Sequence, residues 1–263
     1  MHSVALTYVC ALALVVLIPF CGGGGIDRPP ITEVSSDAVT YDTEDGVRIV
    51  AGWYLPEGVT NPPVVILLHE EDATRAQWDV LIPILVREGY AVLAPDIRGF
   101  GESTTMVRDG QVEPYEFGEP VEAMRDVQAA IQWLKGRSEV DASRIGIAGS
   151  RLGADLAYVS TAIFPEVKAA VAITPDPYDA NDPLLGGIRD YAAHDVFFMA
   201  GSRIAWEVAA TLGIRVDVVG GDRYEDHSDL DGVALLTIDK PVEDILGWFQ
   251  PRLLGTTAPT ASS

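Results

Sequence analysis

Residues 144–154 read Arg-Ile-Gly-Ile-Ala-Gly-Ser-Arg-Leu-Gly-Ala, and this stretch decides the predicted fold. It begins as an apolar run typical of a buried strand, and a helix is expected to follow from Leu152. Gly149 and Gly153 stand two residues on either side of Arg151. Glycines at this spacing let a strand turn sharply into a helix, because their missing side chains leave room for close backbone contact. The sequence therefore predicts a tight strand-to-helix turn centred on Arg151.

Strand-like and helix-like segments alternate on both sides of this turn. Asp45-Gly46 indicates a turn in an opening antiparallel hairpin. Short continuous apolar runs predict buried strands, and longer stripes with helical spacing predict helices. Repeated strand–helix–strand units favour an α/β domain with a mainly parallel sheet of about eight strands and helices on both faces. The expected strands are 39–41, 47–55, 64–68, 90–94, 144–148, 167–173, 196–200 and 214–219, and the expected helices are 77–88, 119–135, 152–164, 204–212 and 239–249.

The chain of 263 residues is long enough for one domain with a sizeable core. We expect that domain to span residues 37–252. A leader (1–21) and a Gly-, Pro- and Ser-rich tether (22–36) precede it, and a disordered tail (253–263) follows it.

The leader is almost wholly apolar from Val4 to Phe20, and Cys21 with four glycines follows it. This order resembles a bacterial lipoprotein signal, in which Cys21 is lipidated. Phe20 is larger than the residue such signals prefer, and the leader has no Lys or Arg. An uncleaved anchor and a cleaved export signal stay open as alternatives. All three place the domain outside the cytoplasm, and the first two tether it to the membrane.

Composition excludes several classes of function. The chain has 39 Asp and Glu against 18 Lys and Arg, a net charge of −21, which argues against nucleic acid as a partner. Both cysteines, Cys10 and Cys21, fall in the leader, so we expect no disulfide within the domain. There is no cluster with metal-ligand spacing and no phosphate-binding loop. We therefore expect neither a metal nor a cofactor.

The stretch from Val64 to Ser103 carries a family resemblance. His69 ends a strand, and Asp96-Ile97-Arg98-Gly99-Phe100-Gly101-Glu102-Ser103 follows the next one. Together with the glycine-flanked turn, these residues resemble the α/β-hydrolase superfamily over residues 38–250. The short spacing between strands 167–173 and 196–200 leaves no room for a cap domain, as in the lidless dienelactone-hydrolase branch. The resemblance implies an α/β-hydrolase fold with a nucleophile, a histidine, an acid and two backbone N–H groups at one site.

The nucleophile position of that pattern is Arg151, and a guanidinium cannot attack a carbonyl. The rival register makes Ser150 the nucleophile, but Leu152 would then stand where the turn favours glycine. His227 matches the family's histidine. The acid position after strand 196–200 falls at Ile204, with no carboxylate before Glu207. Acids placed one strand earlier, Asp176 or Asp179, stay open as the alternative.

The oxyanion-loop equivalents are His69, Glu70 and Leu152, and Glu71 and Asp72 extend the loop. Carboxylates here oppose the stabilisation of a developing oxyanion. An acidic solvated loop is one interpretation. The other is that Arg151 forms an ion pair with a carboxylate of residues 70–72. If Arg151 lacks such a partner, its guanidinium favours an anionic ligand.

These residues indicate a non-catalytic α/β-hydrolase-fold protein that binds a small ligand or a protein, or acts as a scaffold. The alternative is an active serine hydrolase of the esterase or dienelactone-hydrolase type. It would use Ser150 and His227 with Asp176 or Asp179.

Overall fold

The computed structural model describes residues 37–175, 193–203, 207, 219–224 and 229–255. The predicted leader and tether, together with Cys21, Asp176, Asp179, Ile204 and His227, lie outside these residues. The predicted helix 204–212 and the segment between strands 167–173 and 196–200 lie largely outside them too.

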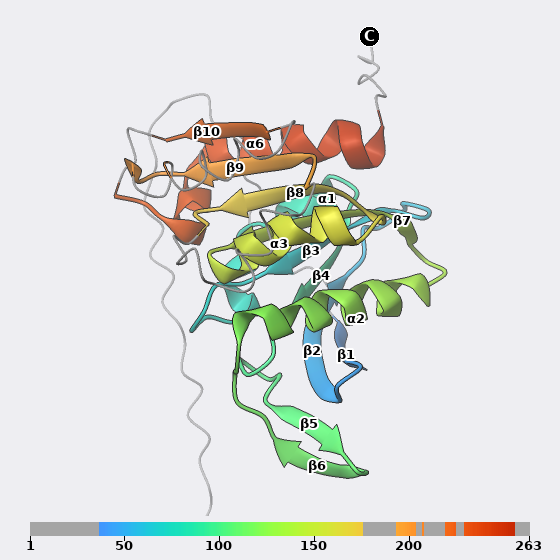
Figure 1. Cartoon of the computed structure of the whole chain (residues 1–263). Coiled ribbons are helices and arrows are strands. Elements are labelled where there is room, and N and C mark those ends of the chain that lie inside the picture. The colour runs from blue at the N-terminus through green and yellow to red at the C-terminus, as the bar shows by residue number, and fades with distance from the viewer. Residues whose placement is uncertain (1–36, 176–192, 204–206, 208–218, 225–228, 256–263) are drawn as a thin grey trace, which may run out of the picture.

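A mostly parallel sheet forms the middle layer of the molecule (Figure 1). Its strands run in the order β10-β9-β8-β7-β3-β4-β2-β5-β6, and β1 pairs with β2 in an antiparallel arrangement. The described sheet thus has ten strands, with the parallel α/β architecture that the sequence predicts. The strands are β1 (Asp37–Asp42), β2 (Val47–Tyr54), β3 (Pro63–Leu68), β4 (Ala91–Pro95), β5 (Thr105–Arg108), β6 (Gln111–Pro114), β7 (Asp141–Ser150), β8 (Val167–Ile173), β9 (Val196–Ala200) and β10 (Val219–Arg223).

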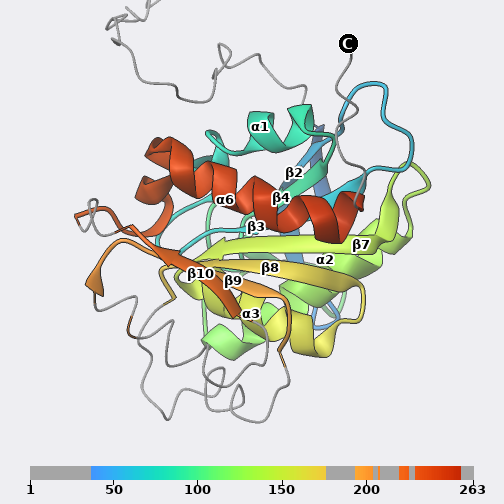
Figure 2. The same ribbon diagram turned by 90° about the horizontal axis from the view of Figure 1, so that it is seen from above.

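Helices cover both faces of the sheet, as Figure 2 shows from above. On one face lie α2 (Met124–Lys135) and α3 (Leu152–Ile163), and on the other lie α1 (Ile82–Arg87) and α6 (Asp239–Phe249). Two apolar clusters fill the space between the layers, one on each face. Shorter helical turns are η1 (Arg75–Trp78), η2 (Pro120–Ala123), η4 (Gly232–Thr237) and η5 (Gln250–Leu254).

The central strands are apolar throughout because both of their faces are covered. Every residue of β3 and β4 is buried, whereas the first residues of β2 alternate between buried and half-buried positions. Continuous burial is the pattern expected of strands between two helical layers. Strand β7 pairs in parallel with both β3 and β8, so the carboxyl ends of these three strands lie side by side.

Several predicted boundaries differ from the structure. The predicted helix 77–88 is two pieces, η1 and α1, and Pro83 lies in the first turn of α1, where proline's missing N–H costs little. Of the predicted strand 214–219, only Val219 lies within the described residues, and it begins β10, which continues to Arg223. Helical structure continues to Leu254, past the predicted domain end at residue 252. The β5–β6 hairpin has no counterpart in the prediction.

A buried charge network ties the first hairpin to α2. Arg98 is fully buried, and its Nε donates to Asp126 Oδ1 at 2.7 Å while Nη1 donates to Asp45 Oδ2 at 2.8 Å. Burial raises the pKa of Asp126 to about 6, against the opposing effect of Arg98. Although burial acts the other way at Asp45, hydrogen bonds from Arg98 and Thr43 lower the pKa of Asp45 to about 2. Arg98, which belongs to the family-like stretch 96–103, therefore has a structural role.

Candidate active site

The strand-to-helix turn lies between β7 and α3 and is centred on Arg151. This residue has φ +49° and ψ −115°, a backbone conformation that residues other than glycine rarely adopt. Its N–H donates to the carbonyl oxygen of Ile173 in β8 at 3.1 Å, and its own carbonyl accepts from Asp155 in α3. The turn is thus fixed to the sheet on one side and to the helix on the other. Arg151 thus occupies the strained position of the turn between β7 and α3.

The two flanking glycines have no room for a side chain. A Cβ on Gly149 would lie 1.9 Å from the carbonyl oxygen of Gly153. A Cβ on Gly153 would lie 2.1 Å from the carbonyl oxygen of Leu68 at the end of β3. Both contacts are with backbone atoms, which cannot rotate away. Close packing of the turn against the sheet is therefore the reason for the glycine spacing, as the sequence predicts.

Arg151 and Ser150 share one carboxylate. Glu70 Oε2 lies 3.3 Å from Arg151 Nε and accepts a hydrogen bond from Ser150 Oγ at 3.2 Å. The predicted ion pair between Arg151 and the 70–72 loop is thus confirmed for Glu70. The Arg151 side chain is 39% exposed and that of Glu70 26%, so solvent screens the pair. Ser150 is the last residue of β7 and is fully buried.

His69 has a structural part in this site. Its ring is buried, and Nε2 accepts from the Ile97 backbone N–H at 2.7 Å. Nδ1 therefore carries the proton and donates to the Glu70 carbonyl oxygen at 2.7 Å. Burial lowers the pKa of His69, so the ring is held neutral. These bonds fix the start of the loop that carries Glu70. The third oxyanion-loop equivalent, Leu152, is the first residue of α3.

The neighbouring strand end brings in residues that sequence reasoning missed. Thr174 follows β8, and its hydroxyl donates to Asp231 Oδ1 at 3.1 Å and accepts from the Gly232 N–H at 2.9 Å. A Cβ on Gly232 would lie 2.9 Å from Glu70 Oε2 and 3.0 Å from Ser150 Oγ. The start of η4 is therefore packed on the turn. Asp231-Gly232 is a dipeptide typical of turns, so the sequence could have predicted a turn here, but no local pattern links this pair to Thr174.

Among the described residues 201–203 and 207, which follow β9, the one carboxylate belongs to Glu207. Glu207 is exposed and forms an ion pair with Arg203. Arg203 lies three residues after the end of β9. This contact agrees with the interpretation of Glu207 as a solvated surface residue. The other predicted positions, Ile204, His227, Asp176 and Asp179, lie outside the described residues, so their roles stay predictions.

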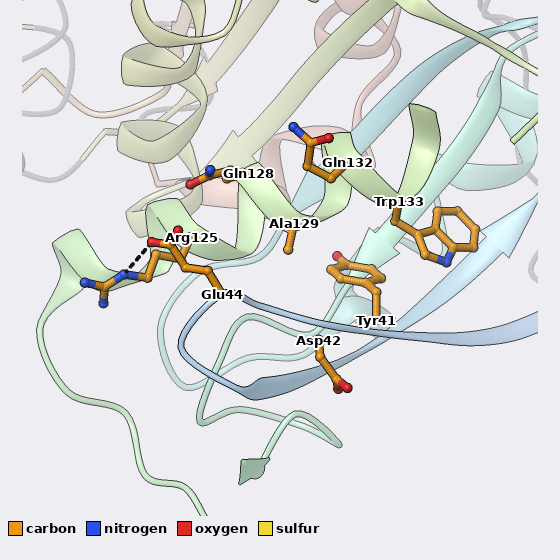
Figure 3. A pocket seen from close by; sticks show the side chains of 8 residues that line it. All are labelled: Tyr41, Asp42, Glu44, Arg125, Gln128, Ala129, Gln132 and Trp133. Atoms are coloured by element: carbon orange, nitrogen blue, oxygen red, sulfur yellow. Dashed lines mark ion pairs between the residues drawn. The ribbon is translucent and has the colours of Figure 1, made fainter. Parts of the chain in front are cut away.

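Other parts of the described chain offer weaker candidates. A cavity of about 340 Å³ lies between β1 and α2, and Figure 3 shows Arg125 of α2 turned toward Glu44, 3.4 Å from Nε to Oε1. The other charged lining residue, Asp42, pairs with Arg48. Every charged side chain of that lining is thus in an ion pair. Within the described ranges, no group of three or more His, Cys, Asp or Glu residues could hold a metal ion. None of the helices in those ranges is long and apolar enough to cross a membrane.

Comparison with known proteins supports the fold described above. The family model of the dienelactone hydrolase family matches residues 49–207, which is more than half of the chain. An uncharacterised Mycobacterium tuberculosis protein, Rv2307c, is 31% identical over 142 residues, and the match covers 54% of this chain and 46% of that relative. The chain thus spans about half the length of this curated relative.

Solved structures share the fold at low identity. An esterase from Pyrococcus furiosus is similar with a TM-score of 0.68 and 19% identity, over 89% of this chain and 100% of that one. A dienelactone hydrolase from Anabaena variabilis is similar with a TM-score of 0.62 and 17% identity, over 84% of this chain and 100% of that one. By the match to the family model and the fold, the chain belongs to the dienelactone hydrolase family.

Proposed function

We propose that this chain is a non-catalytic member of the dienelactone hydrolase family that binds a small ligand or a partner protein, or acts as a scaffold. The observation that carries the proposal is Arg151 at the centre of the turn, with its side chain paired to Glu70. We further propose that a lipid on Cys21 anchors the domain to a membrane outside the cytoplasm.

The chemistry of the turn supports catalytic silence. Acyl transfer at this position needs a group that can lose a proton and attack a carbonyl, and a guanidinium does neither. The Glu70 carboxylate contacts both Ser150 and Arg151, so a negative charge that developed beside the Ser150 hydroxyl would be repelled by Glu70. The ion pair with Arg151 offsets part of this repulsion.

An active serine hydrolase is the second candidate, and one contact favours it. The Ser150 hydroxyl donates to Glu70, so a carboxylate is within reach of its proton. In that case Ser150 would attack, His227 would be the base, and Asp176 or Asp179 the acid. The full burial of Ser150 weighs against this candidate, because a substrate carbonyl cannot reach the hydroxyl without a rearrangement.

Ester hydrolysis tests the choice between the two candidates. The wild-type chain and the variants Ser150→Ala and Arg151→Ser are assayed on p-nitrophenyl acetate and butyrate. We expect no turnover above buffer for the first two and little for Arg151→Ser, because the Glu70 carboxylate stays in place. Hydrolysis by the wild type that Ser150→Ala abolishes contradicts the proposal. Substantial turnover by Arg151→Ser shows that the oxyanion loop is functional.

The tether is tested separately. Cells expressing the chain are fed a palmitate analogue, and we expect label on the wild type and none on Cys21→Ser. Equal labelling of both proteins, or of neither, refutes the proposed lipid anchor.

A further inference from the structure

Thr174 is strained in a way that its surroundings must compensate. It has φ +48°, an outlying conformation for a β-branched residue, and it is 3% exposed. Such a conformation persists only where neighbouring contacts hold it in place. Here the contacts are the N–H of Thr174 on the Met199 carbonyl oxygen at 2.7 Å and two hydroxyl bonds to the start of η4.

The start of η4 lies directly on the end of β7. We call Asp231 and Gly232 the cover. Gly232 has φ +56° and approaches Ser150 Oγ and Glu70 Oε2 so closely that a Cβ would meet both at about 3 Å. Ser150 has no exposed surface, whereas its neighbour Arg151 is 39% exposed on its side chain. The difference in exposure across one peptide bond agrees with a cover that lies over Ser150 and leaves Arg151 in contact with solvent.

The hydroxyl of Thr174 joins both residues of the cover. It is a donor to the Asp231 carboxylate and an acceptor for the Gly232 N–H, so one side chain fixes the carboxylate and the backbone of the cover together. Without that hydroxyl, the N–H of the buried Gly232 loses the acceptor of its hydrogen bond. An unsatisfied buried donor is costly, and opening to water relieves the cost.

We propose that Thr174 is a positioning residue that holds the cover closed over Ser150, so that an electrophile or acyl ligand reaches this serine only when the cover opens. The inference deepens the proposed function, because it gives a second reason for catalytic silence that does not depend on Arg151. It has its own test, since access to residue 150 is measurable whether or not any ester is hydrolysed.

A single thiol at position 150 reports on access. The native cysteines Cys10 and Cys21 are replaced by serine in the full chain, and Ser150→Cys is added. The rate of reaction with iodoacetamide is followed by mass spectrometry. We expect slow alkylation in this background and a rate about tenfold to a hundredfold higher when Thr174→Val is added. Thr174→Ser keeps the hydroxyl and should stay close to the background rate.

Thr237→Val is the matched control. Thr237 lies in the same helical turn, but its hydroxyl bonds to the Ala234 carbonyl oxygen and does not touch the cover. Its removal should leave the alkylation rate unchanged. Asp231→Ala removes the carboxylate that accepts from Thr174 but leaves the hydrogen bond from the Gly232 N–H to the Thr174 hydroxyl, so it should accelerate alkylation less than Thr174→Val does.

Hydrogen exchange of the Gly232 amide gives a second measurement in a chain that keeps Ser150. We expect protection in the wild type, and a loss of protection in Thr174→Val that Thr174→Ser restores. Rapid alkylation of Cys at position 150 in the chain that keeps Thr174 overturns the proposal. It is also overturned if Thr174→Val changes neither the alkylation rate nor the exchange rate of the Gly232 amide. Labelling of wild-type Ser150 by a serine-directed probe would instead refute the proposed silence, while the effect of Thr174→Val would still be measured separately.

Discussion

Gly153→Ala is predicted to destabilise the protein strongly, although alanine is the better helix former. The new Cβ would lie 2.1 Å from the Leu68 carbonyl oxygen, 2.6 Å from the Leu68 carbonyl carbon and 2.9 Å from the His69 carbonyl oxygen. All three atoms belong to the backbone where β3 ends, so the start of α3 must move by about an ångström. Overpacking of this kind costs about 1 to 3 kcal/mol and at times more. We expect a loss near the upper end, about 3 kcal/mol.

Gly247→Ala is the control, because a Cβ there meets nothing within 4 Å and the residue lies inside α6. Relief of glycine's backbone entropy should stabilise this variant by about 0.5 to 1 kcal/mol. The two alanines should therefore differ by roughly 4 kcal/mol in the free energy of unfolding, measured by urea denaturation with a common m-value. Equal stability of the two variants would refute the argument that backbone contact fixes the register of the turn.

Three further predictions concern charge and pH. Because burial holds the pKa of His69 below its unfolded value of about 6.5, acidification through that pH protonates the unfolded chain more than the folded chain, and stability falls by at most about 1.4 kcal/mol per pH unit. Urea titrations at pH 7.5 and 5.5 should show this loss in the wild type and a smaller one in His69→Gln, and equal losses contradict it. Asp126→Ala leaves Arg98 buried without one of its two carboxylates and should cost about 3 to 5 kcal/mol, and a thermal midpoint within 2 °C of wild type would show the network to be dispensable. Glu70→Gln removes a screened ion pair with Arg151 and should change stability by less than about 1 kcal/mol, with the wild-type advantage shrinking in high salt.

Local rules were enough to predict the turn and much of the sheet. The strands 167–173 and 196–200 and the helix 239–249 begin and end where the sequence places them. Each is bounded by a clear change of pattern. The register of the turn follows from Gly149 and Gly153, because a steric requirement at two fixed positions is a local property that the sequence carries.

Contacts between distant segments were not predictable in the same way. Thr174 and Asp231 are 57 positions apart, and nothing near either residue indicates the other. The β5–β6 hairpin lies at the edge of the sheet and none of its strand residues is buried, so it lacks the apolar run that marks the central strands. In β10, the pair Gly220-Gly221 disfavours a strand locally, and pairing with β9 overrides that preference.

Labelling of the purified full chain with a fluorophosphonate tests the central claim most directly. The probe adds covalently to an activated serine, and intact-mass spectrometry reports the addition on the wild type and on Ser150→Ala. The geometry of Arg151, Glu70 and the buried Ser150 predicts no mass shift for either protein. A stoichiometric shift on the wild type that disappears in Ser150→Ala would contradict it and establish a working nucleophile one residue before the centre of the turn.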